Sequence, residues 1–342
     1  MSTLKFSVAG RLGVLTVFVL GAGLLMVNGA QSDPPELASW LINKTGATGY
    51  GGQIANVQTV QYSDNNVYVS STGIPSYSIG PWPGQPNTPT VQNYIFRVLR
   101  KPTENTGTKV STPIGPMGVL TNGVPVYDAQ DMQSYNNQNI WHQNALVVEA
   151  PGIDKCNGHP QQLGGYHHHA NPKCAYTDDP NQHSPLLGYS FDGYPIYGPR
   201  GCANADGTGD VKLMKSSYRL RNITQRTTLP NGTSLNNNQA GPDVSTRYPL
   251  GYYLEDYEYI AKLGDLDAHN GRFAVTPEYP HGTYAYFVTI DEKGTPQYPY
   301  IIGPQYFGTV ATDNFGRGHV NINESVKTYQ GGTLTSTKKD CK

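Results

Sequence analysis

Short runs in which apolar and polar residues alternate recur along the chain, whereas few windows keep an apolar repeat of 3.6 residues over three helical turns. Clear examples of such runs are residues 66–70, 94–98, 145–149 and 284–290. They are rich in β-branched and aromatic side chains, and polar or turn-forming residues flank most of them. The pattern predicts a mainly β protein, either sandwich-like or an irregular β domain, with long ordered loops.

The longest apolar run lies near the N-terminus. Lys5 and Arg11 precede this run, and the small residues Gly29 and Ala30 follow it. This order is typical of a secretory signal peptide, and the run is shorter than the ~20 residues that a transmembrane helix needs. We predict that residues 1–30 are a signal peptide cleaved near Ala30, with an uncleaved membrane anchor as the alternative. No later stretch is apolar enough to insert stably into a membrane, so we expect a secreted or periplasmic protein.

Changes in composition divide the remaining chain. Residues 31–109 are predicted to form a strand-rich N-terminal segment, in which 76–93, rich in Pro and Gly, are a loop. Residues 110–310 form the central domain. Within it, residues 203–248 are polar and carry several turn signals, which indicates a long surface excursion. Residues 311–342 are a polar C-terminal tail.

One short internal echo occurs in the central domain. Residues 122–128 read NGVPVYD and residues 192–198 read DGYPIYG. Asn-Gly and Asp-Gly favour tight hairpin turns, and the proline confines the next strand to an edge or a strand start. The echo predicts two equivalent hairpins that face each other across a core, unless it is a coincidence in a chain rich in Tyr, Pro and Gly.

Charge and cysteine content narrow the class of protein. The net charge is -1, only 14% of residues are charged, and no basic stripe occurs, so nucleic-acid binding has no electrostatic support.

The four cysteines are an even number, which suggests disulfides in an exported chain. We expect Cys156 to pair with Cys174, because this bond closes a short loop around a run of histidines. Cysteine ligation of a metal is the rival interpretation, but the chain contains no C-x-x-C pair.

The histidine run is the strongest chemical signal. Tyr166 is followed by His167, His168 and His169. Successive side chains of a strand point to opposite faces, so His167 and His169 are expected on one face, with Tyr166 and His168 on the other. Such a pair can present two imidazoles to one metal ion if a third ligand comes from elsewhere. The alternative is that the histidines are structural and hydrogen-bonded.

Two histidines are candidates for the third ligand. His159 lies in a Gly-His-Pro turn that can return towards the strand, and His183 is the second choice. Imidazole ligands favour a divalent ion such as Zn or Cu, and an open position on the ion favours a catalytic or transport site, with a metal-dependent hydrolase as the candidate activity. Asp192 or Glu149 is expected to orient a ligand by accepting its other ring N–H.

The same residues can also work without a metal, with imidazole as acid or base. In either version, Tyr166 or Tyr197 is a candidate for positioning a substrate. Serine hydrolysis is disfavoured, because no G-x-S-x-G nucleophile motif is present.

Several motifs in a fixed order resemble the YHYH-domain family of exported proteins. They begin with DKCNGHP at 154–160, GYHHH at 165–169, HSPLLG at 183–188 and FDGYPIYGP at 191–199. They continue with SSYRLR at 216–221, EDYEY at 255–259, LDAHNGR at 266–272, TPEYP at 276–280 and GTYAY at 282–286. The resemblance covers residues 110–310 and implies a YHYH-type domain rather than a particular activity. This chain has His168 where the motif that gives the family its name has its second tyrosine.

Two further classes of function compete with the metal site. Abundant aromatic residues, low charge, a β framework and export suit an extracellular carbohydrate- or surface-binding module, with a small molecule or glycan as partner. In that interpretation Asp192, Tyr194 and Tyr197 form a sugar platform, whereas the simpler interpretation is a packed hairpin. The third class is a structural component of an extracellular assembly.

Overall fold

The structure is a computed structural model, and it describes residues 3, 33–316, 318–331 and 341. The predicted signal peptide lies outside the described residues except for position 3. In the described part of the chain, short strands dominate and helices are few, so the prediction of a mainly β protein is confirmed. No helix among these residues is long and apolar enough to cross a membrane.

The helices are all short. The α-helices are α1 (Pro35–Ala38) and α2 (Ala145–Val148). The single-turn 3-10 helices are η1 (Tyr50–Gly52), η2 (Tyr135–Asn137), η3 (Ala150–Gly152), η4 (Leu254–Asp256) and η5 (Thr312–Asn314).

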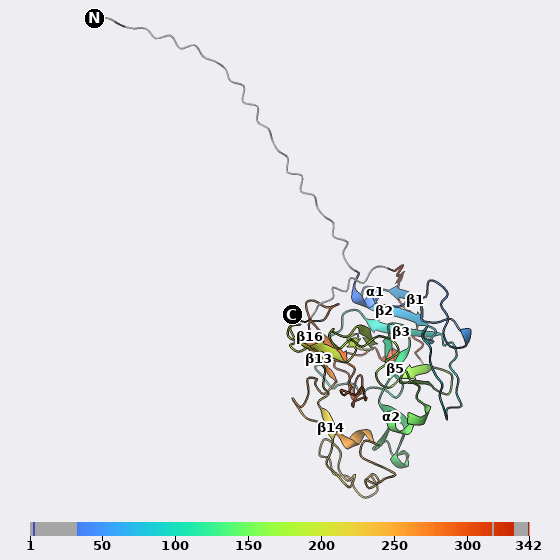
Figure 1. Ribbon diagram of the computed structural model, residues 1–342, viewed down its shortest axis with the longest axis vertical. Coiled ribbons are helices and arrows are strands. Elements are labelled where there is room, and N and C mark those ends of the chain that lie inside the picture. The colour runs from blue at the N-terminus through green and yellow to red at the C-terminus, as the bar shows by residue number, and fades with distance from the viewer. Residues whose placement is uncertain (1–2, 4–32, 317, 332–340, 342) are drawn as a thin grey trace. The chain divides into compact units, whose positions relative to one another are not determined.

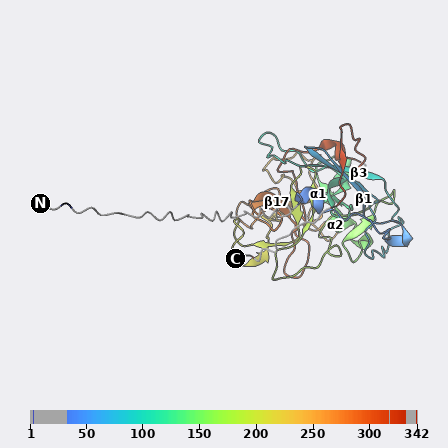
Figure 2. The same cartoon turned by 90° about the horizontal axis from the view of Figure 1, so that it is seen from above.

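A four-stranded sheet joins the N-terminal segment to the C-terminal region, in the order β18–β1–β2–β3 (Figure 1, Figure 2). Its strands are β1 (Val57–Tyr62), β2 (Asn66–Ser71), β3 (Tyr94–Leu99) and β18 (Lys327–Thr328). In β3 the alternate residues Tyr94, Phe96 and Val98 are buried, which is the period of a strand with one face on a core. Phe96 stacks on Phe191, at 5.7 Å between ring centroids, and so links this sheet to the central domain.

The central domain is built on an eight-stranded sheet with the order β16–β17–β11–β10–β4–β5–β9–β8. Its strands, in chain order, are β4 (Pro116–Leu120), β5 (Pro125–Tyr127), β8 (Gly158–Pro160), β9 (Tyr166–His168), β10 (Leu186–Ser190), β11 (Pro195–Tyr197), β16 (Gly271–Ala274) and β17 (Thr283–Phe287). Smaller two-stranded sheets flank it. They pair β6 (Gln130–Ser134) with β7 (His142–Asn144), β12 (Arg200–Cys202) with β13 (Val211–Leu213), and β14 (Tyr218–Leu220) with β15 (Tyr257–Tyr259).

The large sheet consists of two equivalent halves that meet where β4 pairs with β10. In the first half, the hairpin β4–β5 pairs through β5 in parallel with β9, and β9 pairs antiparallel with β8. In the second half, the hairpin β10–β11 pairs through β11 in parallel with β17, and β17 pairs antiparallel with β16. The first half is β4–β5–β9–β8 and the second is β10–β11–β17–β16. The β4–β10 ladder is itself symmetric, because Gly188 faces Leu120 and Gly118 faces Ser190.

The two hairpins of this sheet are those that the internal echo predicts. Gly118 faces Val126 in the first hairpin, and Gly188 faces Ile196 at the same place in the second. Both turns have a glycine with a positive φ, 81° at Gly123 and 87° at Gly193. At each of these glycines an added Cβ would lie within 2.5 Å of the N-terminal sheet, so both turns pack closely against it. The hairpins are neighbours in one sheet rather than partners across a core.

A second repeated feature, an aspartate bonded to a tyrosine, lies at the outer strands of the large sheet and was not predicted from the sequence. Asp154 and Asp267 each accept hydrogen bonds from a tyrosine hydroxyl and from a nearby glycine N–H. The tyrosines are Tyr166 in β9 and Tyr284 in β17. Each aspartate begins a D-x-x-N-G sequence, at 154–158 and 267–271, and both asparagines have a positive φ. The two halves therefore share side-chain architecture as well as topology.

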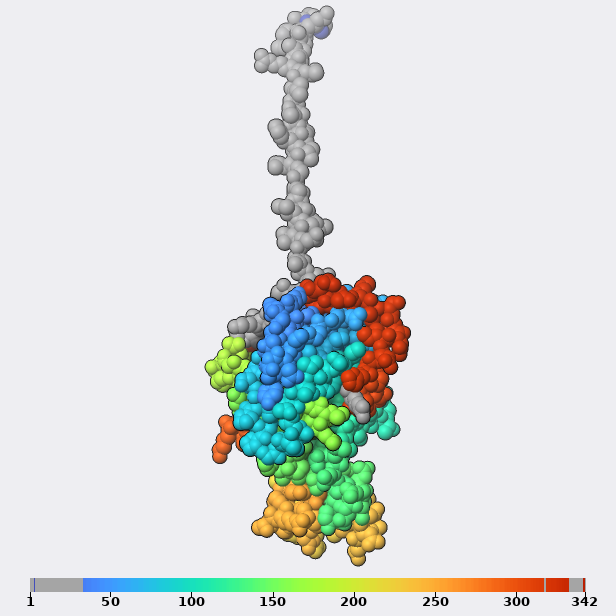
Figure 3. Space-filling model, turned by 90° about the vertical axis from the view of Figure 1, so that its right-hand side faces the viewer, coloured from blue at the N-terminus to red at the C-terminus, as the bar shows by residue number. Residues whose placement is uncertain are grey.

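Two local expectations differ from the structure. Residues 145–149 are not a strand, because α2 begins there, with the Asn144 side chain accepting the N–H of Leu146 as a helix cap. The excursion at 203–248 is not wholly on the surface. Arg226 is fully buried and forms an ion pair with Asp256 at 2.7 Å. Figure 3 shows part of the excursion, in yellow to orange, beside the green part of the chain at one end of the surface.

Candidate metal centre

Strands β8 and β9 bring three histidines together at the edge of the large sheet. His159 in β8 faces His167 in β9 in the antiparallel register. His169 follows β9 and lies on the same face as His167, with 3.1 Å between the two Nε2 atoms. Tyr166 and His168 occupy the opposite face, where their rings contact each other at 5.2 Å. The alternation inferred from the sequence is therefore present in the structure.

The three rings form a compact, buried group. One ligand atom from each of His159, His167 and His169 lies within 4.8 Å of the others. None of the three residues is more than 5% exposed. Among the described residues, this is the group of histidine, cysteine and acidic side chains whose geometry can hold a metal ion.

The Nδ1 atoms of the three rings have partners outside the group. The Nδ1 of His167 lies 3.1 Å from the carbonyl oxygen of Gly165, and that of His169 lies 2.5 Å from the carbonyl oxygen of Asp128. A carbonyl only accepts, so each Nδ1 carries the proton, which leaves Nε2 as the ligating nitrogen. The side-chain amide of Gln85 lies 3.3 Å from Nδ1 of His159. These contacts orient the rings, as the partners of metal-bound histidines do in proteins generally.

Glu149, which follows α2, supplies a carboxylate on the Nε2 side of the group. Its Oε2 lies 3.2 Å from Nε2 of both His159 and His169. Oε2 of Glu149 and Nε2 of His159 are both buried, and apart from these close contacts within the group neither atom has a hydrogen-bond partner. A buried carboxylate oxygen and ring nitrogens that converge in this way can be satisfied by protons on the rings or by a bound cation.

The electrostatics of the group follow from burial and from this carboxylate. Burial and the neighbouring histidines hold the pKa of His167 well below its ordinary value, so that ring is neutral near pH 7. Burial also acts to lower the pKa of His169, but Glu149 and the Asp128 carbonyl outweigh it and raise this pKa. Against its own burial, contact with the two rings lowers the pKa of Glu149. Glu149 is therefore ionised near neutral pH and favours positive charge in the group.

The histidine group lies at the wall of a pocket of about 410 Å³, which we call the metal pocket. The Tyr127 ring stacks on His167 with 3.9 Å between centroids, and Tyr127 also lines this pocket. Gln85, Gln130 and Gln161 add uncharged amide groups to the wall. A metal ion bound here would be within reach of a small polar molecule.

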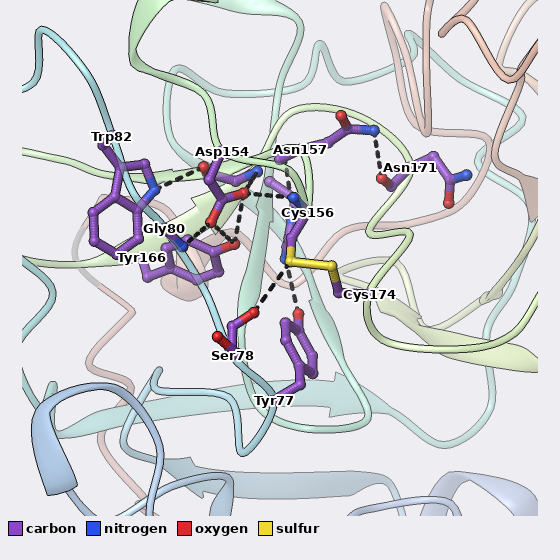
Figure 4. The surroundings of a disulfide bond; sticks show 12 residues. Tyr77, Ser78, Gly80, Trp82, Asp154, Cys156, Asn157, Tyr166, Asn171 and Cys174 are labelled. Atoms are coloured by element: carbon purple, nitrogen blue, oxygen red, sulfur yellow. Dashed lines mark hydrogen bonds between the residues drawn. A yellow bond between two sulfur atoms is a disulfide. The ribbon is translucent and has the colours of Figure 1, made fainter.

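The face behind the histidines is a packed structural region, which Figure 4 shows around the first disulfide. Cys156 is bonded to Cys174, the pair expected from the sequence, and a second disulfide joins Cys202 to Cys341. Asp154 accepts bonds from the N–H of Gly80 at 2.7 Å and from the hydroxyl of Tyr166 at 3.0 Å. Tyr166 therefore supports the strand and does not face the metal pocket.

Three other residues predicted for the site lie elsewhere. His183 does not join the group, because its ring packs against Tyr197 at 5.1 Å and its Nδ1 bonds the Ser184 carbonyl. Tyr197 is fully buried, with its hydroxyl bonded to Thr276 and Glu278. Asp192 is also fully buried, where it accepts bonds from Tyr286 and the N–H of Gly308. Tyr197 and Asp192 belong to a packed hairpin rather than to a sugar platform.

Glu149 lies next to the Nε2 ligand atoms of His159 and His169, and does not accept the Nδ1–H of a ligand as the sequence suggested. The contacts that hold the rings come instead from Gln85, Tyr127 and the Asp128 carbonyl. Tyr127 and Asp128 are in the first echo motif, so a signal existed, but it was interpreted only as a hairpin. Gln85 lies in a Pro-rich loop and gives no sequence signal.

The second half of the large sheet contains the same framework without the histidines. Its pairings place Arg272 at the position of His159, Ala285 at the position of His167 and Phe287 at the position of His169. The Asp267–Tyr284 hydrogen bond is nevertheless present there. The same strand pairings therefore form in the second half with other residues at the three histidine positions.

Comparison with known proteins agrees with the sequence motifs. The chain matches the family model described as YHYH protein over residues 95–299, a stretch that includes all three histidines. No curated protein and no solved structure matches the chain. Since the match covers more than half of the sequence, the chain belongs to the YHYH protein family.

Proposed function

We propose that this protein binds one divalent transition-metal ion through the Nε2 atoms of His159, His167 and His169. The observation that carries the proposal is the convergence of three buried ring nitrogens on one carboxylate oxygen, since Nε2 of His159 and Oε2 of Glu149 lie 3.2 Å apart and have no hydrogen-bond partner outside the group. A purely structural triad would be expected to satisfy its own hydrogen bonds.

The donor set favours Zn or Cu. Imidazole nitrogen suits both ions, whereas Ca and Mg prefer several oxygen ligands. Three histidines leave a fourth position for Glu149 or for water, which is the arrangement of an open rather than a closed site. The uncharged amides of the metal pocket suit a small polar substrate. We infer metal-assisted hydrolysis as the activity: an ion held by the three histidines would supply Lewis-acid activation of water, and Glu149 is the carboxylate placed to accept a proton there.

Metal titration of the purified mature protein tests the proposal. After removal of bound metal with a chelator, we expect Zn or Cu to rebind at one ion per chain. The double variant His167→Ala/His169→Ala should lose at least about 100-fold in affinity, because it removes two of three ligands. His168→Gln is the matched control from the same strand and should bind normally. Absence of stoichiometric metal binding, or normal binding by the double variant, contradicts the proposal.

We also propose that the protein is exported. Two disulfides and a signal-like N-terminal sequence support this, since disulfides persist in oxidising compartments. Mass spectrometry of the protein made in its native host should find an N-terminus close to position 31 and both disulfides intact. A reduced protein that retains residues 1–30 and stays in the cytoplasm would contradict this.

A further inference from the structure

A second pocket lies beside the metal pocket, and the proposed metal ligands do not line it. Its volume is about 480 Å³, and we call it the tyrosine pocket after its aromatic wall. That wall consists of Tyr218, Tyr257, Tyr259 and Tyr298. Gln130 lines both pockets, so they adjoin at the start of β6.

The aromatic wall is built by the β14–β15 pair and the chain around Tyr298. Tyr218 faces Tyr259 across the β14–β15 register, with 5.5 Å between ring centroids. Tyr257 stacks on Tyr298 at 4.4 Å, which holds both rings in place. The hydroxyl of Tyr218 donates to the Ala268 carbonyl. Tyr259 is 37% exposed, so part of this wall is open to a ligand.

Two of the residues that line the tyrosine pocket, Asp128 and Glu255, are carboxylates that already have hydrogen-bond partners. Asp128 accepts bonds from the Thr112 hydroxyl and from the N–H of Gln130. Glu255 accepts the main-chain N–H of His142 at 2.8 Å and pairs with its ring at 2.5 Å. Each carboxylate oxygen has a second lone pair, so both groups can still accept a hydrogen bond from a ligand.

The charge of the lining restricts the ligand. Among the residues that the structure describes, no lysine or arginine lines the tyrosine pocket, which disfavours phosphates, sulfates and carboxylates. The two acidic side chains are already hydrogen-bonded, so little uncompensated negative charge remains for a cation. The volume is also large for a lone quaternary ammonium group. An exposed tyrosine ring, Tyr259, beside carboxylates that can accept hydroxyl hydrogens suits a neutral sugar.

We propose that the tyrosine pocket binds a neutral oligosaccharide, with the aromatic wall against a sugar ring and Asp128 and Glu255 accepting its hydroxyl groups. This site is separate from the metal centre, and its ligand does not need the metal. Because the two pockets adjoin at Gln130, a bound chain would extend towards the metal pocket.

Calorimetric titration of the full mature protein with maltohexaose, cellohexaose, xylohexaose and chitohexaose tests this proposal. We expect saturable binding of at least one of these probes. Tyr259→Ala should weaken it at least about tenfold, because it removes an aromatic contact face. Phe273→Ala is the matched control, since Phe273 is an exposed aromatic residue at 60% that lies outside the pocket, and it should bind normally.

The His167→Ala/His169→Ala variant separates this proposal from the proposed metal site. It should bind the saccharide normally, whether or not the protein binds metal. The proposal is overturned if none of the probes binds, or if Tyr259→Ala binds as the parent does. It is also overturned if heparin or choline chloride competes at lower concentration than the saccharide, because an anion or a cation would then be the preferred ligand.

Discussion

At the scale of single residues, the proposed metal site depends on which nitrogen of each ring is free. Main-chain carbonyls of Gly165 and Asp128 hold Nδ1 of His167 and His169, so the ligating Nε2 atoms are set before any metal arrives. The alternation of a strand predicted that these two rings share a face. The carbonyl partners were not predictable, because any residue supplies a carbonyl and the sequence does not show which one is near.

Replacing Glu149 by glutamine tests the contribution of its charge. Glu149→Gln keeps the side-chain size but removes the carboxylate next to two ring nitrogens. We expect metal affinity to fall about 10- to 100-fold, as is typical when a group that supports the ligands is lost. Competition against a metal-binding dye measures the change. Glu258→Gln, in β15, is a control that should leave affinity unchanged, and an unchanged affinity in Glu149→Gln would show that the carboxylate is a bystander.

His183 provides a test of pH-dependent stability away from the proposed metal site. Burial lowers its pKa to about 4, against 6.5 for an ordinary histidine. As pH falls below 6.5, the unfolded chain takes up a proton that the folded protein refuses until about pH 4. This histidine should therefore cost up to about 1.4 kcal/mol of stability per pH unit in that window.

The variant His183→Gln should lose this contribution. Urea unfolding between pH 7 and pH 4 is expected to show a steeper loss of stability for the parent protein than for the variant. Equal slopes for the two proteins would mean that His183 is protonated as easily in the folded state as in the unfolded one.

At the scale of elements, the sequence predicted most of the strands in which apolar and polar residues alternate. The alternating runs at 66–70, 94–98 and 284–290 correspond to β2, β3 and β17, although β17 ends at Phe287. The prediction of a strand at 145–149 was wrong, because the Asn144 cap favours a helix over a strand there. Parallel pairing of β5 with β9 was not predictable, since it joins segments about 40 residues apart that share no pattern.

The two copies of the Asp–Tyr bond offer a matched experiment. Tyr166→Phe removes the hydroxyl that bonds Asp154, and Tyr284→Phe removes the equivalent hydroxyl at Asp267. Each change should lower the free energy of unfolding by about 1–2 kcal/mol, because a carboxylate that is buried at Asp154 and partly buried at Asp267 loses a donor.

Only Tyr166→Phe should also weaken metal binding, since Tyr166 precedes the proposed ligands His167 and His169, whereas no proposed ligand lies in or next to β17. Urea unfolding and metal titration of both variants measure the two effects. Equal weakening of metal binding in both variants would mean that the loss comes from general destabilisation and not from the strand that holds the histidines.

At the scale of the whole molecule, the disulfides stabilise regions of different extent. Cys156–Cys174 joins residues 18 apart around the histidine strand, whereas Cys202–Cys341 joins residues 139 apart. In the chain-entropy model, removing them should cost about 3 and about 5 kcal/mol respectively. The first pair was predictable from its position around the histidines, and the second then follows, because two cysteines remain.

Paired serine variants distinguish the two bonds by function. Cys156→Ser/Cys174→Ser should lower both thermal stability and metal affinity, because the loop that it frees contains His159, His167 and His169. Cys202→Ser/Cys341→Ser should lower stability while leaving metal affinity near that of the parent protein. Thermal unfolding followed by metal titration checks both outcomes, and a loss of metal binding in the second variant alone would contradict this assignment.

The ladder between β4 and β10 has a consequence for what each half of the sheet must supply. Its register is the same when read from either strand, as it is in the two-fold interface of a homodimer. Two half-length chains joined edge to edge through one strand each would build the same sheet. Because one chain contains both halves here, the histidines are needed in only one of them, and the other half, with Arg272, Ala285 and Phe287 at the corresponding positions, completes the sheet as scaffold.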